Sequence, residues 1–177
     1  VPPIPGLEEV DYLTSDNVWN LRELPKRLVV LGGGPIGSEL TQTFARFGSQ
    51  VTQVEMAPRI LIREDPEVSE RVTARFRQEG IRVLIDHQAK RFAVENGEKI
   101  LIAEHDGVDV RIPFDAVLVA VGRVANTAGY GLEGLGIPTT RARTVETNEY
   151  LQTLYPNIYA AGDVAGPFQF THTAAHQ

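Results

Sequence analysis

The sequence predicts an α/β fold, with a doubly wound parallel sheet into which a small antiparallel β-meander is inserted. Apolar runs over residues 27–31 and 114–121 are typical of parallel strands that are covered on both faces. Segments with the helical spacing of apolar residues alternate with these strand-like runs, as in βαβ units. Two Asx-Gly dipeptides, at 96–97 and 106–107, separate three further strand-like segments and predict the turns of the meander.

Length, composition and charge narrow the class of protein. The 177 residues can form one good core and part of a second domain. A hydrophobic content of 42% and a charged content of 23% exclude wholesale disorder. The net charge of −6 argues against a nucleic-acid partner, which needs a basic face. No apolar stretch approaches the roughly 18 residues of a membrane span, so we expect no membrane partner. The chain has no cysteine, which excludes a thiol nucleophile and a thiolate metal site within it.

The first βαβ unit is expected after an extended approach segment over residues 1–24, which is rich in proline and turn-forming residues. A strand over 27–31 leads into a helix over 35–48, and a strand over 50–55 follows. Pro35 suits the first helical turn, where its missing N–H costs nothing, and Gly48 suits the helix end. The inner face of this helix is predicted to carry Ile36, Leu40, Phe44 and Phe47.

The spacing of apolar residues also predicts the remaining helix, strands and loop. A helix over 66–79 begins after Asp65, with Val68, Val72 and Phe76 as its predicted inner face. A strand is expected over 81–85, and a glycine-rich loop over 122–136. The other predicted strands are the meander at 89–95, 98–105 and 108–112, the run 114–121, and a last short buried strand over 158–161.

A glycine-rich turn between the first strand and the first helix carries the functional prediction. Gly32, Gly34 and Gly37 form a G-x-G-x-x-G pattern, and Glu55 closes the next strand about 20 residues later, the arrangement that holds a dinucleotide. Gly32 permits the tight turn, Gly34 lets the main chain approach the pyrophosphate, and Gly37 lets the helix sit close to the strand. The helix N-terminus offers free N–H groups to the phosphates. The predicted NAD(P) contacts are Gly32, Gly33, Gly34, Pro35, Ile36, Gly37, Glu55, Met56 and Gly122.

Three further stretches extend the motif: residues 115–127, 146–153 and 156–164. Together with 32–39 they resemble the flavin-dependent pyridine nucleotide–disulfide oxidoreductases, in the class I branch that contains dihydrolipoamide dehydrogenase, mercuric reductase and glutathione reductase. The resemblance covers nearly the whole chain, with four motifs in the family's order. It implies a Rossmann-like NAD(P)-binding domain and a partial FAD-domain segment.

The resemblance also implies domain boundaries. Residues 1–12 would be a linker from an FAD-domain half, residues 13–126 the NAD(P)-binding domain, and residues 127–177 a truncated segment that returns to the FAD domain. The chain opens without Met and stops within an expected helix, so we expect a piece of a longer enzyme. The intact enzyme is expected to bind FAD as well as NAD(P)H, to form a homodimer and to be cytoplasmic.

The FAD contacts are expected near the C-terminus. Residues 153–163 match the family's second FAD motif, in which Asp163 would accept hydrogen bonds from the ribitol and Gly162 would admit the backbone beside it. An Asp after a strand also caps turns, which is the alternative. Thr171 and His172 resemble the start of the helix that points at the flavin. His172 and His176 share a helix face but no third ligand is in view, so no metal site is expected.

Two residues near the turn have competing interpretations. The resemblance places Glu39 beside the flavin, where it would pair with a lysine of the missing half; the alternative is an acid on the helix surface. Pro35 stands where several relatives carry a tyrosine lid, or it serves as a first-turn residue and nothing more. Gly122 suits close approach of the nicotinamide, and Arg123 would contact phosphate or support its loop.

Cofactor preference follows from the end of the second strand. The Glu55 carboxylate accepts hydrogen bonds from both ribose hydroxyls and repels a 2′-phosphate. NADPH-using relatives tend to carry Arg where this chain has Met56, so NADH is favoured. Arg59 and Arg63 lie close downstream and keep NADPH open.

The chain is therefore predicted to be the NAD(P)H-binding part of an FAD-dependent oxidoreductase. In the intact protein, hydride would pass from NADH or NADPH to FAD and on to a disulfide, a metal ion or another acceptor, while the fragment alone is expected to be inactive. Two alternatives stay open: a non-catalytic dinucleotide-binding sensor module, and a cysteine-independent flavoprotein reductase of the NADH or ferredoxin type.

Overall fold

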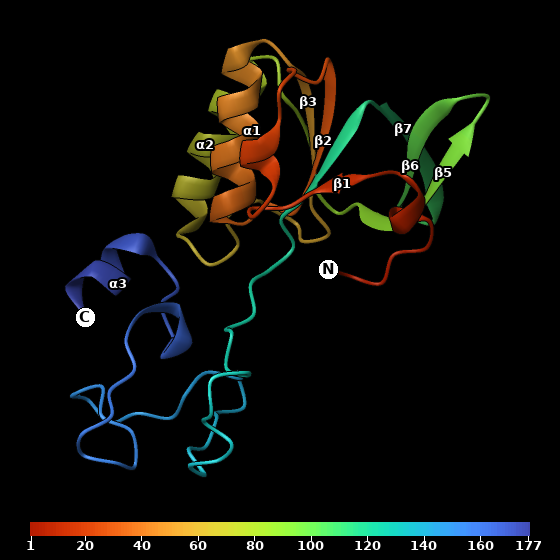
Figure 1. The fold of residues 1–177 in the computed structure, drawn as a ribbon. Coiled ribbons are helices and arrows are strands. Elements are labelled where there is room, and N and C mark those ends of the chain that lie inside the picture. The colour runs from red at the N-terminus through yellow and green to blue at the C-terminus, as the bar shows by residue number, and fades with distance from the viewer. The chain divides into compact units, whose positions relative to one another are not determined.

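A computed structural model describes residues 1–177, which divide into two compact units, Val1–Gly122 and Arg123–Gln177. The first unit holds both sheets and the two long helices, α1 (Pro35–Phe47) and α2 (Pro66–Gln78) (Figure 1). The second unit is mostly loops, with the 3₁₀ turn η3 (Gly162–Val164) and the short helix α3 (Thr171–His176). No helix combines the length and the apolarity that crossing a bilayer requires.

The main sheet is fully parallel, as the continuous apolar runs predicted, and its strand order is β1-β8-β2-β3-β4. Its strands are β1 (Tyr12–Leu13), β2 (Arg27–Leu31), β3 (Gln50–Val54), β4 (Arg82–Leu84) and β8 (Ala116–Val119). The chain winds outward from β2 through β3 to β4, and β8 then joins the other side of β2. The strand order therefore reverses between β2 and β8. Open α/β sheets bind their ligands at the carboxyl ends of the strands beside such a reversal.

Strand β2 separates two apolar cores because its side chains alternate between the two faces of the sheet. Val29 and Leu31 face the meander, where they join Phe92 and Phe114. Leu28 and Val30 face the helices, where the aromatic partners are Phe44 of α1 and Phe76 of α2. Both faces of the sheet are thus covered, by helices on one side and by a second sheet on the other (Figure 1).

The meander is confirmed as an antiparallel sheet of β5 (Gln88–Glu95), β6 (Glu98–His105) and β7 (Val108–Phe114). Both predicted turns have two consecutive residues with positive φ: 52° and 82° at Asn96-Gly97, and 51° and 76° at Asp106-Gly107. These values are typical of the type I′ turn, which matches the twist of a hairpin.

The predicted inner faces of the two helices are confirmed at Phe44 and Phe76, with Leu40 and Val72 packed against the same core, and are wrong at one residue in each helix. Phe47 is 67% exposed, and Val68 is also exposed. The buried residues are small: α1 turns Gly37, Ser38 and Thr41 inward beside Phe44, and α2 turns Ser69 inward beside Phe76. The reason in α1 is the close approach at Gly37, which brings the helix backbone against the turn after β2 and leaves no room there for a large side chain.

Two predicted segments are wrong in detail. Residues 1–24 are not merely extended, because β1 pairs with β8 in parallel and Leu7, Val10 and Val18 are buried. The strand expected over Ile158–Ala161 is reduced to one antiparallel bridge between Gln152 and Tyr159, and Tyr159 is exposed. A strand needs neighbours for its ladder of hydrogen bonds, and residues 123–177 supply only this bridge at that point.

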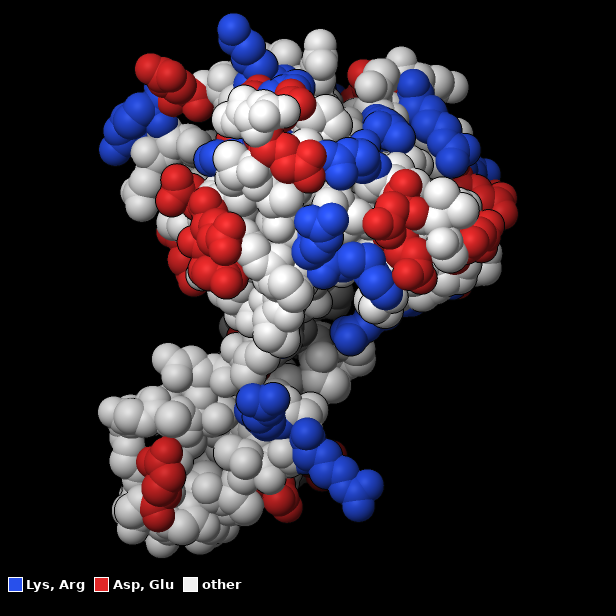
Figure 2. All heavy atoms as spheres, turned by 90° about the vertical axis from the view of Figure 1, so that its right-hand side faces the viewer, with Lys and Arg blue, Asp and Glu red and all other residues white.

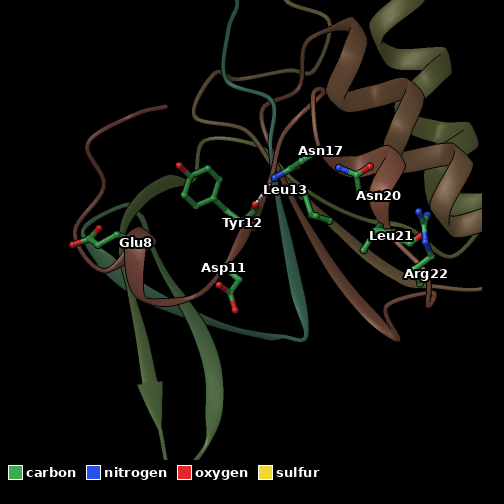
Figure 3. A pocket seen from close by; sticks show the side chains of 8 residues that line it. All are labelled: Glu8, Asp11, Tyr12, Leu13, Asn17, Asn20, Leu21 and Arg22. Atoms are coloured by element: carbon green, nitrogen blue, oxygen red, sulfur yellow. Dashed lines mark hydrogen bonds between the residues drawn. The ribbon is translucent and has the colours of Figure 1, made fainter.

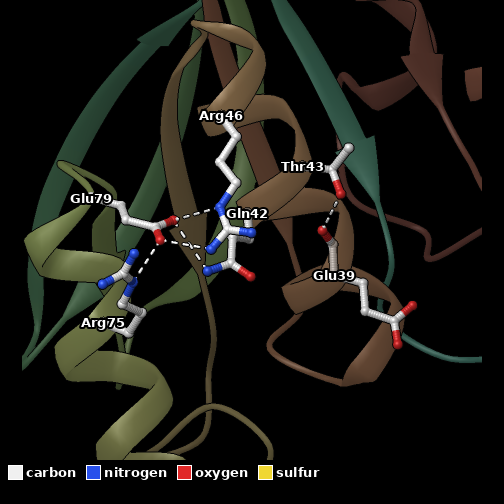
Figure 4. Close-up of polar contacts among 6 residues, drawn as sticks. All are labelled: Glu39, Gln42, Thr43, Arg46, Arg75 and Glu79. Atoms are coloured by element: carbon white, nitrogen blue, oxygen red, sulfur yellow. Dashed lines mark hydrogen bonds and ion pairs between the residues drawn. The ribbon is translucent and has the colours of Figure 1, made fainter.

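A carboxylate ties the C-terminal ends of α1 and α2 together (Figure 4). Glu79 accepts hydrogen bonds from Arg46 at 2.8 Å, Arg75 at 2.6 Å and Gln42 at 3.1 Å, and its side chain is only 14% exposed. Hydrogen bonding from Arg46, with further bonds from Arg75 and Gln42, lowers the pKa of Glu79 from 4.5 to about 2. The same pairing raises the pKa of Arg46.

This network gives an expected pH dependence of stability. Because the pKa of Glu79 is lower in the folded state, its contribution is complete above pH 4.5 and is lost as the pH falls toward 2. Wild type is expected to be more stable than Glu79→Gln at neutral pH, and the gap in unfolding free energy should close between pH 4.5 and pH 2. Urea unfolding at several pH values measures it. A gap that stays constant over this range would contradict the assignment.

Candidate functional site

The turn after β2 has the backbone that its glycines were predicted to supply. Gly32 has φ +103°, and a Cβ there would lie 2.3 Å from the carbonyl oxygen of Ala120. A Cβ on Gly37 would lie 2.2 Å from the carbonyl oxygen of Gly32. Gly34 is the N-cap of α1 and has nothing within 4 Å of a Cβ position, and Pro35 is the first residue of the helix. Two of the glycines are thus needed for packing, whereas Gly34 borders open space.

Glu55 follows β3 and reaches back to this turn. Its two carboxylate oxygens accept hydrogen bonds from the N–H of Gly33 at 2.5 Å and the N–H of Ala57 at 2.7 Å. The carboxylate is half-buried and is fixed at both oxygens. Each oxygen keeps a second lone pair, so the group is oriented and still able to accept from a pair of hydroxyls. The oriented Glu55 carboxylate, as an acceptor for hydroxyls, and the open space at Gly34 fit a dinucleotide.

The loop after Glu55 folds over the turn, a feature that the sequence did not reveal. The N–H of Leu61 donates to the carbonyl oxygen of Gly33 at 2.6 Å, and Ile60 is fully buried beside it. Arg59 donates to the carbonyl oxygens of Glu64 at 2.8 Å and Ile62 at 2.9 Å, so its guanidinium holds the loop together. Met56 is 71% exposed next to the carboxylate.

A buried polar network lies behind the turn and was also missed. Gln53, near the C-terminal end of β3, donates to the carbonyl oxygen of Gly32 at 3.1 Å and to the hydroxyl of Ser38 at 3.2 Å. Ser38 in turn donates to the carbonyl oxygen of Gly33 at 3.3 Å. The sequence did offer one sign of it: Gln53 is a polar residue in a strand predicted to be buried in a parallel sheet, and such strands are normally apolar.

The other predicted contacts of the first unit lie on the same edge or on α1. Gly122 follows β8 with φ +146° and nothing within 4 Å of a Cβ position. Ile36 is half-buried in the first turn of α1. Glu39 is exposed on α1, and its carbonyl oxygen accepts from the Thr43 hydroxyl at 2.8 Å, while its carboxylate points away from the Glu79 network (Figure 4).

The second unit carries the four predicted FAD contacts. Asp163 in η3 forms an ion pair with Arg123. Gly162 has φ +77°, and its N–H donates to the side-chain oxygen of Gln177 at 2.7 Å. Thr171 begins α3, and the ring of His172 stacks on Phe170 with centroids 5.4 Å apart. The question left open for Arg123 thus has a structural answer within this unit: it binds a carboxylate.

Three further observations concern surfaces away from the predicted contacts. A hollow of about 550 Å³ lies beside β1 and is lined by Glu8, Asp11, Tyr12, Leu13, Asn17, Asn20, Leu21 and Arg22 (Figure 3). It is shallow and separate from the predicted contacts. On the meander face of the first unit, basic and acidic side chains are interspersed (Figure 2). No group of three or more His, Asp or Glu is arranged to hold a metal ion.

Comparison with known proteins gives a consistent result. The whole chain, residues 1–177, matches the family described as pyridine nucleotide-disulphide oxidoreductase. A mercuric reductase of Staphylococcus aureus is 40% identical over 177 residues, covering 100% of this chain and 32% of the relative. A dihydrolipoyl dehydrogenase of Acholeplasma laidlawii is 38% identical, covering 100% of this chain and 52% of the relative.

Solved structures agree. The HOCl-induced flavoprotein disulfide reductase RclA from Escherichia coli superposes with a TM-score of 0.88 at 34% identity, over 99% of this chain and 40% of that one. LpdA from Mycobacterium tuberculosis gives a TM-score of 0.80 at 30% identity, over 93% of this chain and 35% of that one. The chain therefore spans about a third of the length of the mercuric reductases that it matches.

Proposed function

The chain belongs to the pyridine nucleotide-disulphide oxidoreductase family, and from this premise we propose that it contributes the NAD(P)H-binding domain of an FAD-dependent oxidoreductase. The family resemblance carried by the four motifs is confirmed. The observation that supports the proposal most strongly is the Glu55 carboxylate, which is fixed on the N–H of Gly33 where the strand order reverses. We assign residues 13–126 to this domain, residues 1–12 to a linker and residues 127–177 to a segment of the FAD domain.

The residues around the turn have separable tasks in this proposal. Gly34 borders the space for the pyrophosphate, and the N-terminus of α1 presents free N–H groups and the positive end of its dipole to it. Glu55 accepts from the adenosine ribose hydroxyls, with Met56 beside it. Gly122, at the carboxyl end of β8, lets the nicotinamide half come close.

The flavin side of the proposal rests on the second unit and on α1. Asp163 and Gly162 would contact the ribitol, and Thr171 and His172 would lie near the ring, where the N-terminus of α3 favours negative charge. Glu39 would face the flavin edge. When both cofactors are bound, they supply the hydride transfer, and the protein supplies positions and electrostatics. We place the intact enzyme in the cytoplasm as a homodimer.

NADH is the proposed dinucleotide. A 2′-phosphate would meet the Glu55 carboxylate, and repulsion between the two charges would cost affinity. Arg59 is the nearer of the two arginines that left NADPH as an alternative. Its guanidinium donates hydrogen bonds to two carbonyl oxygens of its own loop. Arg63 is exposed in the same loop.

Titration of the full-length protein with NADH and with NADPH tests the proposed function. We expect NADH to bind at least about tenfold more tightly, because one uncompensated charge contact costs about 1.4 kcal/mol or more. A tenfold preference for NADPH would reverse the cofactor assignment. If neither dinucleotide binds, the proposed function is wrong.

A further inference from the structure

We propose that Gln53 is a positioning residue for the dinucleotide, which acts by holding the peptide between Gly32 and Gly33 in one orientation. The binding part of this inference rests on the proposed function. Gln53 contacts no open surface: it is fully buried near the C-terminal end of β3. Its amide nitrogen donates to the carbonyl oxygen of Gly32 at 3.1 Å, from behind the turn.

The geometry of a peptide unit links this contact to the site. The carbonyl of Gly32 and the N–H of Gly33 belong to one planar trans peptide, so they point in opposite directions. Fixing the oxygen on the Gln53 amide, between α1 and β3, therefore aims the N–H the opposite way, toward Glu55, whose carboxylate accepts it at 2.5 Å. A glycine pair has a wide choice of backbone angles, so this orientation needs an external hold.

Ser38 extends the hold to the next carbonyl. Its hydroxyl accepts from Gln53 at 3.2 Å and donates to the carbonyl oxygen of Gly33 at 3.3 Å. Gln53 and Ser38, from β3 and α1, thus bind two successive carbonyls of the turn. These two side chains hold the turn from the protein interior, in addition to the Leu61 N–H on the carbonyl oxygen of Gly33, and the open space for a ligand lies at Gly34.

The network lowers the stability of the fold, which indicates that Gln53 serves the site and not folding. The side-chain oxygen of Gln53 is buried without a hydrogen-bond partner, and so is the hydroxyl of Thr41 at the same helix–sheet interface. A buried polar atom without a partner lowers stability, and an apolar side chain of similar size would avoid that cost. Gln53 differs from Thr41 in one respect that matters here: of the two side chains, only Gln53 forms a hydrogen bond to the turn.

Two substitutions separate the positioning role from a structural one. Gln53→Met keeps the length of the side chain and removes the donor, and we expect it to weaken NADH binding by about fivefold with the urea midpoint unchanged or raised. Thr41→Val, the matched control, removes the other unpartnered atom and should leave NADH binding unchanged. Ser38→Ala gives a second route if Gln53→Met folds poorly, with an expected weakening of about twofold to threefold.

Amide hydrogen exchange at Gly33 in the free full-length protein tests the hold without any dinucleotide. Faster exchange in Gln53→Met and unchanged exchange in Thr41→Val would support the inference. Unchanged exchange in both, or NADH affinity that falls equally in both, would overturn it. If wild type binds neither NADH nor NADPH, the proposed function fails together with the binding role of Gln53, while the exchange rates still decide whether Gln53 holds the turn.

Discussion

Gly37→Ala is expected to destabilise the protein by about 3 kcal/mol, at the upper end for overpacking a tight contact. The new Cβ would lie 2.2 Å from the carbonyl oxygen of Gly32 and 3.1 Å from its carbonyl carbon. Both are backbone atoms, so α1 has to move away from β2. Because the turn is built on that contact, NADH binding should weaken as well. Urea unfolding measures the loss, and an unchanged midpoint would contradict the close approach.

Gly34→Ala, three residues earlier in the same turn, is the matched control. A Cβ there meets nothing within 4 Å and the φ of −72° suits alanine, so the cost in stability should be limited to the N-cap preference for Gly over Ala, about 1 kcal/mol or less and well below that of Gly37→Ala. If the pyrophosphate lies against this backbone, the methyl group occupies its space, and NADH binding should weaken by about tenfold or more. A variant with normal stability and normal NADH affinity would show that the phosphates do not lie there.

Glu55→Ala is the second change with a large expected effect. Hydrogen bonds to a charged group contribute about 1.5–3 kcal/mol, so the dissociation constant for NADH should rise by about 10-fold to 100-fold. The ratio of NADH to NADPH affinity should fall, because the charge that opposes a 2′-phosphate is gone. Isothermal titration with both dinucleotides measures both changes.

Glu55→Gln refines this test. The amide keeps the shape and one accepting oxygen, but its NH₂ faces one of the two N–H donors, those of Gly33 and Ala57, that the carboxylate now accepts. We expect an NADH affinity between wild type and Glu55→Ala. An unchanged dissociation constant in both variants would remove Glu55 from the site.

The parts of the fold that depend on local chemistry were predictable from the sequence. The G-x-G-x-x-G turn was recognisable because each glycine has a separate steric reason, and at two of the three a Cβ would lie only 2.2–2.3 Å from a backbone oxygen. The hairpin turns were predictable because Asn-Gly and Asp-Gly favour positive φ at both positions. The helix bounds followed from Pro35, Gly48 and Pro66.

What the sequence could not supply depends on contacts between distant segments. The inner face of α1 was predicted from large apolar residues, but the close approach at Gly37 requires a residue without a side chain at that point, and Phe47 at the end of the helix is exposed. The role of Arg59 was undecidable, since its carbonyl partners are defined only by the path of its own loop. Gln53 stands out in the sequence only as a polar residue in a strand expected to be buried, and its hydrogen-bond partner is defined only because β3 passes behind the turn.

A crystal structure of the full-length protein with NADH tests the central claim most directly. We expect the pyrophosphate at the N-terminus of α1 against Gly34, and the adenosine ribose on the Glu55 carboxylate. Electron density for the dinucleotide at any other place, with the turn of residues 32–37 left uncontacted, would contradict it.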